Sequence, residues 1–387
     1  MFNIKTINNI SDKGLSRLPT DTYAISPEAD DPDAIILRSQ KLHDMDIPSN
    51  LKVVGRAGAG TNNVPVDRLG DEGVVVFNAP GANANAVKEL VICGMLLACR
   101  NICQAWQYAA NVEGSDEEQN KAVEAGKKKY VGYELPGRTL GVVGLGAIGV
   151  EIANAAVALG MRVVGFDPTI TVKSAWKMSS AVEEMASIEE LLKEADFVSF
   201  HVPLIDATLN LLNAERIAGM KDGSVILNFA RNGIVDDDAA LAALESGKIS
   251  AYVCDFPAEN LKRNDRVITL PHLGASTAEA EENCAMMVAD QIKDFLENGN
   301  IINSVNFPVV KLPRGGKARV GITHKNMPDM IAKITSEVGE KGYNIFHMRN
   351  ESKNDLAYTL MDIESEIGDD LISHLGAIEG VLKARQV

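Results

Sequence analysis

A chain of 387 residues is longer than one ordinary hydrophobic core requires, so its length predicts two or three domains. Its formal net charge is −15 and its Lys and Arg residues are scattered, which argues against a nucleic-acid partner. No apolar run approaches the roughly 20 residues that a membrane span needs, so we expect neither a transmembrane helix nor a membrane partner.

The N-terminus and the cysteines indicate a compartment. The first residues, MFNIKTINNISDKGL, mix charge and polarity where a secretory signal has a continuous apolar stretch. The five cysteines, at 93, 99, 103, 254 and 284, form no C-x-x-C pair and no cluster with histidine at metal-ligand spacing. We therefore expect a reduced, cytoplasmic environment and no metal. An anionic small molecule can still be the substrate, because a few Arg and Lys residues can converge in a pocket.

The first hundred residues alternate strand-like runs with turns, which is typical of an α/β domain. The predicted strands lie in DAIILRSQ (33–40), NLKVVGRAGAG (50–60) and GVVVFNAPGAN (73–83). From Ala84 to about Ala110 the pattern predicts one helix with apolar residues around much of its circumference, as in a buried or interface helix.

A second series of strands begins at LPGRTLGVVGLGAIG (135–149) and continues through MRVVGFDP, ADFVSFHVP, GSVILNFARNG and ISAYVCDFP. Strands rich in Val, Ile and Phe that alternate with helices predict a buried parallel sheet. After residue 280 a helix leads to the Pro- and Gly-containing segment near 310–317, where we expect a domain boundary. The last seventy residues read βαββαβ, the order of a ferredoxin-like domain.

These elements predict an α/β chain with two Rossmann-like lobes, one flavodoxin-like and one NAD-binding, and a C-terminal ferredoxin-like domain. The expected substrate domain comprises residues 1–95 and 280–310. The expected NAD-binding domain comprises residues 96–279, and the C-terminal domain residues 318–387.

The motif Gly144-Leu-Gly146-Ala-Ile-Gly149 follows a strand and opens a helix. The first glycine permits a tight turn, the second lets backbone approach a pyrophosphate, and the third lets helix pack on strand. Asp167, at the end of the next strand, can bind a ribose 2′-hydroxyl and would repel a 2′-phosphate, which predicts NAD over NADP. A purely structural glycine turn and a flavin site are the weaker alternatives.

Oxidation of a secondary alcohol needs a group that takes the hydroxyl proton, and the chain has six histidines. His272 in LPHLGAST follows a strand and is surrounded by small residues, so it is the candidate acid/base. His201 also follows a strand and can touch the cofactor. The other four histidines lie in charged or helical segments or in the C-terminal domain: His43, His324, His347 and His374.

Arg231 and Glu259 each lie just beyond the end of a predicted strand. A guanidinium can bind a carboxylate with two hydrogen bonds, and a carboxylate beside an imidazole raises its basicity. The three residue types together suit a 2-keto acid. For Arg231 alone, a surface ion pair is an equally good explanation.

The motifs GLGAIG, FDP, HVPL-x-x-x-T (201–208), NFARNGIVDD and PHLGAST, in this order over roughly residues 30–310, resemble the D-isomer-specific 2-hydroxyacid dehydrogenases. GRAGAGTNNVPVD (55–67), FNAPGANANAVKEL (77–90) and the C-terminal domain, which is similar to an ACT module, resemble the phosphoglycerate dehydrogenases within that family. The resemblance implies NAD-dependent oxidation of 3-phospho-D-glycerate to 3-phosphohydroxypyruvate, the first step of L-serine biosynthesis.

The resemblance also implies roles for individual residues. The implied catalytic residues are Arg231, Glu259 and His272, and Arg56, Gly58, Asn83 and Arg231 are implied to bind the substrate. The NAD contacts comprise the glycine motif and four strand ends: Gly144, Gly146, Ala147, Ile148, Gly149, Asp167, His201, Val202, Pro203, Phe229, Ala230, Arg231, Asp255, His272, Leu273, Gly274 and Ala275.

The C-terminal motif HKNMPDM (324–330) resembles the ACT ligand motif, with Asp329 where glycine is usual. L-serine is therefore a candidate effector at His324, Asn326 and Asn344, and a domain that serves only assembly is the alternative. The loop before Glu259 is one residue shorter than in the phosphoglycerate enzymes. The helix at 84–110 resembles a dimerisation segment, and the ACT-like domain can pair again, so we expect a homodimer or homotetramer.

Two other functions fit the same motifs. One is reduction of glyoxylate or hydroxypyruvate, which differs in whether a phosphate on the substrate improves the specificity constant. The other is an NAD-sensing protein without catalysis, as in corepressors related to this family. The presence of all three catalytic residue types argues against a purely binding role.

Overall fold

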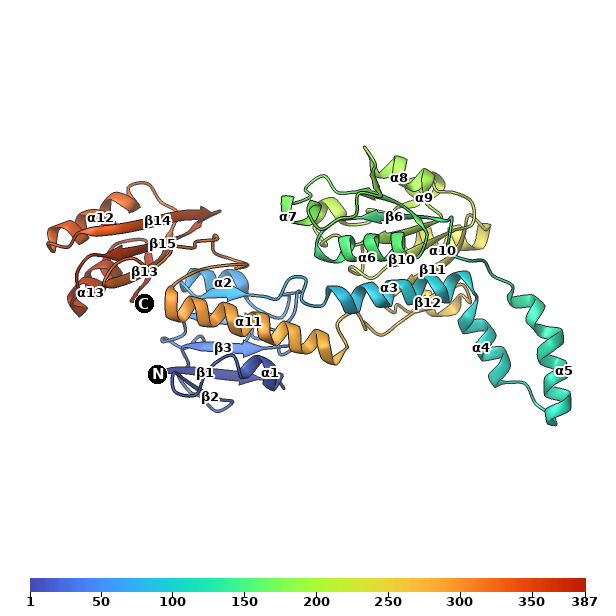
Figure 1. The fold of residues 1–387 in the computed structure, drawn as a ribbon, viewed down its shortest axis with the longest axis horizontal. Helices are drawn as coiled ribbons and strands as arrows, with labels where there is room; N and C mark the ends of the chain where they lie inside the picture. Colours follow the sequence, from blue (N-terminus) through green and yellow to red (C-terminus); the bar gives the residue numbers. More distant parts are fainter. The chain divides into compact units, whose positions relative to one another are not determined.

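The computed structural model describes all of residues 1–387 except the side chain of residue 263, and it divides into two compact units (Figure 1). The first unit comprises Met1–Ala82 and Ala278–Val387, and the second comprises Asn83–Thr277. The second unit thus begins earlier than the expected NAD-binding domain, and the C-terminal domain belongs to the first unit. No helix in the described part of the chain is long and apolar enough to cross a membrane.

The first unit contains a five-stranded parallel sheet in the order β2-β1-β3-β4-β5, the strand order of flavodoxin-like folds. Helix α11 packs on one face, and a glycine at position 55 allows it to come close, because a Cβ there would lie 2.3 Å from Val288. The elements are β1 (Phe2–Ile7), α1 (Asp12–Leu15), β2 (Tyr23–Ser26), β3 (Ala34–Leu37), β4 (Val53–Arg56), α2 (Val66–Asp71), β5 (Val75–Phe77) and α11 (Ala278–Asn298).

The three strands predicted in this region are present, but β1 and β2 extend the sheet beyond the prediction. β1 lies between β2 and β3, yet Ile4 is its only fully buried residue. The polar neighbours on either side have partners: the Asn3 N–H donates to the Asp33 carboxylate at 2.7 Å, and the Lys5 ammonium donates to the Ala29 carbonyl at 3.0 Å. Because β1 is polar, the sequence pattern does not predict that it is a central strand.

The second unit contains a seven-stranded parallel sheet in the order β12-β11-β10-β9-β6-β7-β8. The direction of winding reverses between β6 and β9, which is where doubly wound sheets bind ligands. Its strands are β6 (Thr139–Val143), β7 (Arg162–Phe166), β8 (Val182–Glu184), β9 (Phe197–Phe200), β10 (Ser224–Asn228), β11 (Ile249–Cys254) and β12 (Val267–Thr269). The predicted parallel sheet is confirmed.

Helices cover both faces of this sheet, and each face has its own apolar core. Helix α3 belongs to this unit, and a glycine at position 94 lets it approach the sheet, since a Cβ there would lie 2.9 Å from the Phe229 ring. The helices are α3 (Ala84–Cys99), α6 (Ala147–Ala158), α7 (Val172–Ala175), α8 (Ile188–Glu194), α9 (Ala214–Ala218) and α10 (Asp237–Ser246), with 3-10 turns at Lys127–Tyr130 and Asp206–Thr208.

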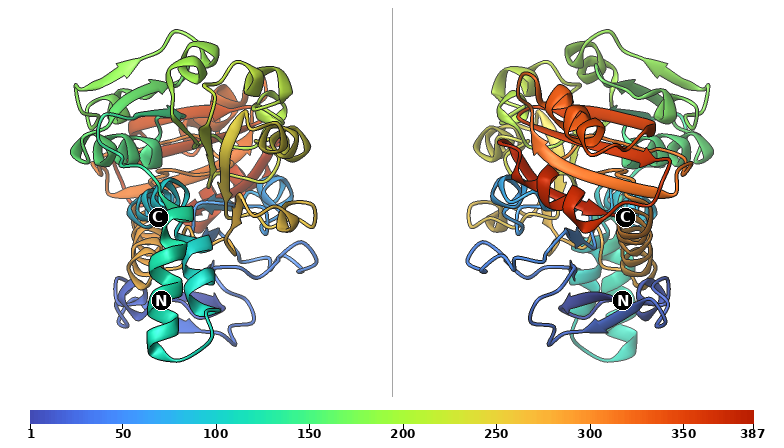
Figure 2. Two further views of the ribbon diagram at one scale, coloured as in Figure 1. Left: turned by 90° about the vertical axis from the view of Figure 1, so that its right-hand side faces the viewer. Right: turned by 90° about the vertical axis from the view of Figure 1, so that its left-hand side faces the viewer.

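The single helix expected over 84–110 is wrong, because the chain forms two helices there. α3 ends at Cys99 and α4 runs over Ile102–Ala110. Between them Asn101 has φ 50°, a left-handed conformation that asparagine tolerates better than most residues and that a continuous helix does not allow. α5 (Asp116–Gly126) then folds back along α4, and the Tyr108 hydroxyl donates to the Ala122 carbonyl at 2.8 Å (Figure 2).

The C-terminal residues confirm the predicted βαββαβ order. They form an antiparallel sheet in the order β14-β15-β13-β16, with α12 and α13 on one face (Figure 2). The other face joins the core of the first unit through Tyr358 and Leu360. The elements are β13 (Ala318–Lys325), α12 (Met330–Glu340), β14 (Ile345–Lys353), β15 (Leu356–Ile363), α13 (Asp369–Ala377) and β16 (Val381–Gln386).

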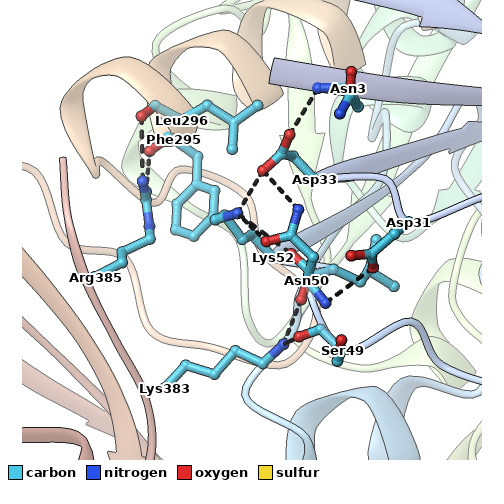
Figure 3. Close-up of polar contacts among 11 residues, drawn as sticks. Asn3, Asp31, Asp33, Ser49, Asn50, Lys52, Phe295, Leu296, Lys383 and Arg385 are labelled. Atoms are coloured by element: carbon cyan, nitrogen blue, oxygen red, sulfur yellow. Dashed lines mark hydrogen bonds and ion pairs between the residues drawn. The ribbon is translucent and has the colours of Figure 1, made fainter. Parts of the chain in front are cut away.

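Two cationic side chains of β16 connect this sheet to the rest of the first unit (Figure 3). The Lys383 ammonium donates to the carbonyls of Ser49 at 3.1 Å and Leu51 at 2.6 Å. The Arg385 guanidinium donates to the carbonyls of Phe295 and Leu296 in the last turn of α11, where a positive charge also complements the helix dipole. Burial lowers the pKa of both side chains.

A buried ion pair holds the start of β13 to β15. Arg319 donates through Nε to Asp362 Oδ1 at 2.6 Å and through Nη2 to Oδ2 at 2.8 Å, and the two side chains are 1% and 0% exposed. Burial alone would raise the pKa of Asp362, but hydrogen bonds from Arg319 and the Gly315 N–H outweigh it and hold the pKa below its usual value.

We predict that Asp362→Ala lowers the free energy of unfolding by about 3–5 kcal/mol, because it leaves the Arg319 charge buried without its partner. Because the pKa of Asp362 is lowered in the folded state, its stabilisation is present above about pH 4 and is lost as the pH falls through the folded pKa. Urea denaturation at several pH values measures both effects. Glu351→Ala, which removes the exposed Arg349–Glu351 pair of the same sheet, is the control and should cost about 0–1 kcal/mol.

Candidate active site

Five sequence-predicted site residues lie just beyond the ends of five strands of the seven-stranded sheet. Gly144 follows β6, His201 follows β9, Arg231 follows β10, Asp255 follows β11 and His272 follows β12. Because all strands are parallel and β9 to β12 are neighbours, these ends share one edge of the sheet. This edge, at the reversal of strand order, is where ligands bind in such folds.

The glycine turn after β6 has the geometry that a pyrophosphate needs. Gly144 has φ 94°, and a Cβ on it would lie 2.6 Å from the His201 carbonyl oxygen. A Cβ on Gly149 would lie 1.9 Å from the Gly144 carbonyl, so this glycine lets α6 pack on the turn. At Gly146 no described atom comes within 4 Å of a Cβ. The space over Gly146, at the N-terminus of α6, therefore fits an anionic group bound by free N–H groups.

Asp167 lies beside this turn at the end of β7. Its Oδ2 accepts the Leu145 N–H at 2.8 Å and its Oδ1 accepts the Thr169 N–H at 2.9 Å. The Thr169 hydroxyl also donates to Oδ1 at 3.2 Å, so these bonds hold the carboxylate next to the glycine turn and leave Oδ2 with further acceptor capacity. Ala147 and Ile148 form the first turn of α6 at the same place. This arrangement fits the ribose next to a bound pyrophosphate.

Asp255 is a buried carboxylate that lies near the backbone of Gly274 and keeps unused acceptor capacity. It is 1% exposed, and neither of its oxygens accepts a well-formed hydrogen bond from the described residues. Burial raises its pKa, and the nearby charges of His272 and Arg231 oppose this shift. A buried acceptor without a donor is costly unless a ligand supplies one. An amide group such as the carboxamide of nicotinamide would fit, so the residues present are compatible with NAD.

His272 is held by the backbone of the neighbouring strand. Its N–H donates to the Asp255 carbonyl at 3.0 Å and to the Leu270 carbonyl at 3.1 Å, and its ring lies 5.1 Å from that of Phe256. Its φ of 52° is unusual for a residue with a side chain and is typical of functional sites. The imidazole is exposed. It is thus both fixed at its backbone and accessible to a small molecule.

Arg231 and Glu259 have exposed side chains. The Arg231 guanidinium donates through Nη1 to the Ala230 carbonyl at 2.7 Å. Glu259 lies on the loop after β11. It follows Phe256 in the sequence, and the Phe256 ring contacts the ring of His272. Its proposed contact with the imidazole remains a prediction.

His201 differs from His272 because it is partly buried, whereas His272 is exposed. Its Nε2 lies 2.7 Å from the hydroxyl of Ser199, which is itself fully buried on β9. Burial lowers the pKa of His201 to about 3, so the ring is neutral at physiological pH. A histidine that stays neutral is a poor proton carrier, which favours His272 for that role. The partner Ser199 was not predicted, although its spacing places it on the same face of the strand.

Arg56 and Gly58 belong to the first unit, at the end of β4. Gly58 has φ 156°, and a Cβ on it would lie 1.6 Å from the Arg56 guanidinium, so the glycine makes room for that side chain. Asn83 precedes α3 as the first residue of the second unit, and its buried side-chain oxygen has no partner among the described residues. Their implied contacts with the substrate remain predictions.

The three positions implied for an effector are not adjacent within one chain. His324 is 2% exposed, and its Nε2 lies 2.9 Å from Thr359 Oγ1 and 3.1 Å from Asn350 Oδ1. Asn326 follows at the same end of the sheet, whereas Asn344 precedes Ile345, which pairs with Ile363 at the opposite end. No group of three or more potential metal ligands lies among the described side chains.

We predict that Gly146→Ala and Gly149→Ala separate ligand binding from folding. Gly146→Ala should leave thermal unfolding of the free protein nearly unchanged, because the added methyl meets open space, but should weaken NADH binding by at least about tenfold. Gly149→Ala should lower the melting temperature, because its methyl clashes with the Gly144 carbonyl. Thermal melts and NADH fluorescence titrations measure both. Unchanged NADH affinity in Gly146→Ala would refute the assignment.

Comparison with known proteins agrees with this geometry. Residues 93–276 match the model of the "D-isomer specific 2-hydroxyacid dehydrogenase, NAD binding domain" family. The D-3-phosphoglycerate dehydrogenase of Haemophilus influenzae is 35% identical over 347 residues, which cover 87% of this chain and 81% of that protein. Some relatives of that name are longer: the chain spans 59% of the one from Methanocaldococcus jannaschii.

A hydroxypyruvate reductase of Thermotoga maritima is 37% identical, covering 69% of this chain and 85% of that protein. Among solved structures, NAD⁺-bound 3-phosphoglycerate dehydrogenase of Entamoeba histolytica superposes with a TM-score of 0.61 at 25% identity, over 79% of this chain and 98% of that one. The predicted fold class and the NAD cofactor are thereby confirmed. The chain belongs to the D-isomer-specific 2-hydroxyacid dehydrogenase family and is an NAD-dependent dehydrogenase.

Proposed function

We propose that the protein oxidises 3-phospho-D-glycerate to 3-phosphohydroxypyruvate, the first step of L-serine biosynthesis. The observation that carries the chemistry is the shared sheet edge at which Arg231, Asp255 and His272 follow three adjacent strands. The choice of substrate is supported by the names of the relatives that match most of this chain. A guanidinium and an imidazole on the same sheet edge as the glycine turn suit a 2-hydroxy acid.

NAD, held by the glycine turn and Asp167, would supply the hydride acceptor for this oxidation. The protein supplies the other half of the reaction: His272 takes the proton of the 2-hydroxyl group as the carbonyl forms. Arg231 binds the substrate carboxylate and orients the reacting carbon. We assign Glu259 to the support of the His272 imidazolium, and Arg56 to an anionic group of the substrate.

Asp255 gives His272 a favourable electrostatic environment in this scheme. Its carboxyl is close enough to His272 and Arg231 for their charges to act on its pKa. A negative charge on Asp255 complements the positive charges that the scheme places on these two residues. The neutral His201 does not compete for this proton.

The second candidate is reduction of hydroxypyruvate or glyoxylate, which the hydroxypyruvate reductase of Thermotoga maritima favours at a similar level of identity. An NAD sensor without turnover is the third. Only the first function requires that a phosphate on the substrate contribute to binding. The contribution of that phosphate therefore distinguishes the candidates.

We predict that NADH forms from NAD with 3-phospho-D-glycerate, and that kcat/KM for this acid exceeds that for D-glycerate and D-lactate by at least about 100-fold, since a charged group adds several kcal/mol of binding. Absorbance at the NADH band, with a trap for the keto product, measures the rates. Turnover of the unphosphorylated acids alone would favour the reductase, and NADH binding without turnover would favour the sensor.

We predict that His272→Asn lowers kcat by about 10²–10⁴-fold, because the proton acceptor is lost, while NADH binding persists. Arg231→Ala should mainly raise KM for the acid. His374→Asn is the matched control, since that histidine lies on α13, where its ring hydrogen-bonds to the Asp370 carbonyl. Full turnover by folded His272→Asn would remove the proposed acid/base.

We also propose a homodimer or homotetramer and regulation by L-serine at His324, Asn326 and Asn344. Exposed apolar side chains on α3 and α4 support self-association: Leu96 is 39% exposed, Ile102 42% and Trp106 71%. Sedimentation of the protein and of Trp106→Glu tests the assembly.

Activity with added L-serine, repeated with Asn326→Ala, tests the effector.

A further inference from the structure

Asn228 is the last residue of β10 and is 1% exposed. Its amide makes two hydrogen bonds to the loop that follows. The side-chain oxygen accepts the Ala230 N–H at 3.2 Å, and the side-chain nitrogen donates to the Arg231 carbonyl at 3.0 Å. One buried side chain therefore holds the peptide group before Ala230 and the peptide group after Arg231.

We call this pair of hydrogen bonds the clamp. It needs an acceptor and a donor on one short side chain. Asparagine offers both, whereas aspartate has no donor when ionised and leucine has neither. Because the site excludes water, a lost bond cannot be replaced cheaply by solvent. The amide thus selects one backbone conformation for Phe229 to Arg231.

The clamp holds the same short segment on which the Arg231 side chain rests. The Arg231 guanidinium donates to the Ala230 carbonyl at 2.7 Å, and that carbonyl belongs to the peptide between the two peptides that the clamp holds. Downstream, backbone bonds from Asn210 to the Gly233 carbonyl at 2.7 Å and from Leu212 to the Ile234 carbonyl at 3.1 Å hold the other end of the loop. The Ile234 N–H also reaches the Arg231 carbonyl at 3.4 Å.

The upstream end is therefore anchored by a side chain and the downstream end by backbone. With both ends fixed, the Cα atom of Arg231 has a defined position while its exposed side chain can rotate. Rotation about side-chain bonds is then enough to take the guanidinium from the Ala230 carbonyl to a bound carboxylate. If the backbone were mobile, the guanidinium would occupy many positions. Its two hydrogen bonds to a carboxylate would then weaken, because they require a specific geometry.

We propose that Asn228 is a positioning residue that sets Arg231 for the carboxylate of the 2-hydroxy acid. This inference rests on the proposed role of Arg231. It assigns Asn228 no contact with the substrate.

The test begins with Asn228→Asp, which keeps the size of the side chain but removes the donor to the Arg231 carbonyl. We expect KM for the acid and the inhibition constant of oxalate, a carboxylate probe that cannot give up a hydride, each to rise at least about tenfold. NADH affinity should change less than about twofold. Asn306→Asp is the matched control, because Asn306 makes the same kind of clamp, at 2.9 Å to Val76 N and 2.9 Å to Val74 O, in the first unit.

A double-mutant cycle with Arg231→Ala decides whether Asn228 acts through Arg231. The change at 228 should lower kcat/KM at least about tenfold when Arg231 is present and less than about twofold in the Arg231→Ala background. Equal losses in both backgrounds would overturn the inference. Normal activity of Arg231→Ala alone would instead overturn the proposed function. If the buried charge prevents Asn228→Asp from folding, the neutral Asn228→Ser carries the same cycle with the same criteria.

Discussion

The parallel register of the seven-stranded sheet is the constraint on which the candidate site depends. Backbone hydrogen bonds place β10, β11 and β12 side by side, so that residues far apart in the sequence meet beyond their ends. No single side-chain contact joins Arg231 to His272. A shift of one strand by one residue would turn alternate side chains to the other face and disperse the site. The long-range order of the sheet therefore acts as the scaffold for chemistry on its loops.

Burial influences the pKa values of the site residues as much as nearby charges do. His201 is kept neutral because its ring is removed from water, while Asp255 is buried next to two cationic candidates. These two groups follow β9 and β11, which lie on either side of β10 in the sheet. Such differences in environment are how one fold assigns different roles to similar side chains.

Sequence patterns predict the features that depend on local structure. The glycine motif after a strand, Asp167 at the end of the next strand and the βαββαβ order all follow from spacing and composition, and the structure has these elements in this order. β1 escapes prediction because it is polar, and the ammonium of Lys5 is satisfied by the Ala29 carbonyl, which is distant in sequence. The break at Asn101 depends on one backbone angle. Ser199 and Asn228 act through contacts that only the folded chain creates, and buried Asn and Ser are not distinguishable from loop residues in a single sequence.

The sheet of the C-terminal domain contributes Tyr358 and Leu360 to the same core as Phe77 and Phe295. The Phe295 ring lies 6.4 Å from Tyr358 and 6.0 Å from Phe77, so an aromatic path crosses from one sheet to the other. A module attached only by a linker can be removed or exchanged without harm to its host. Here truncation before Ala318 would expose the core of the neighbouring lobe to water. Gain or loss of this module during evolution must therefore be accompanied by substitutions on the surface of that lobe.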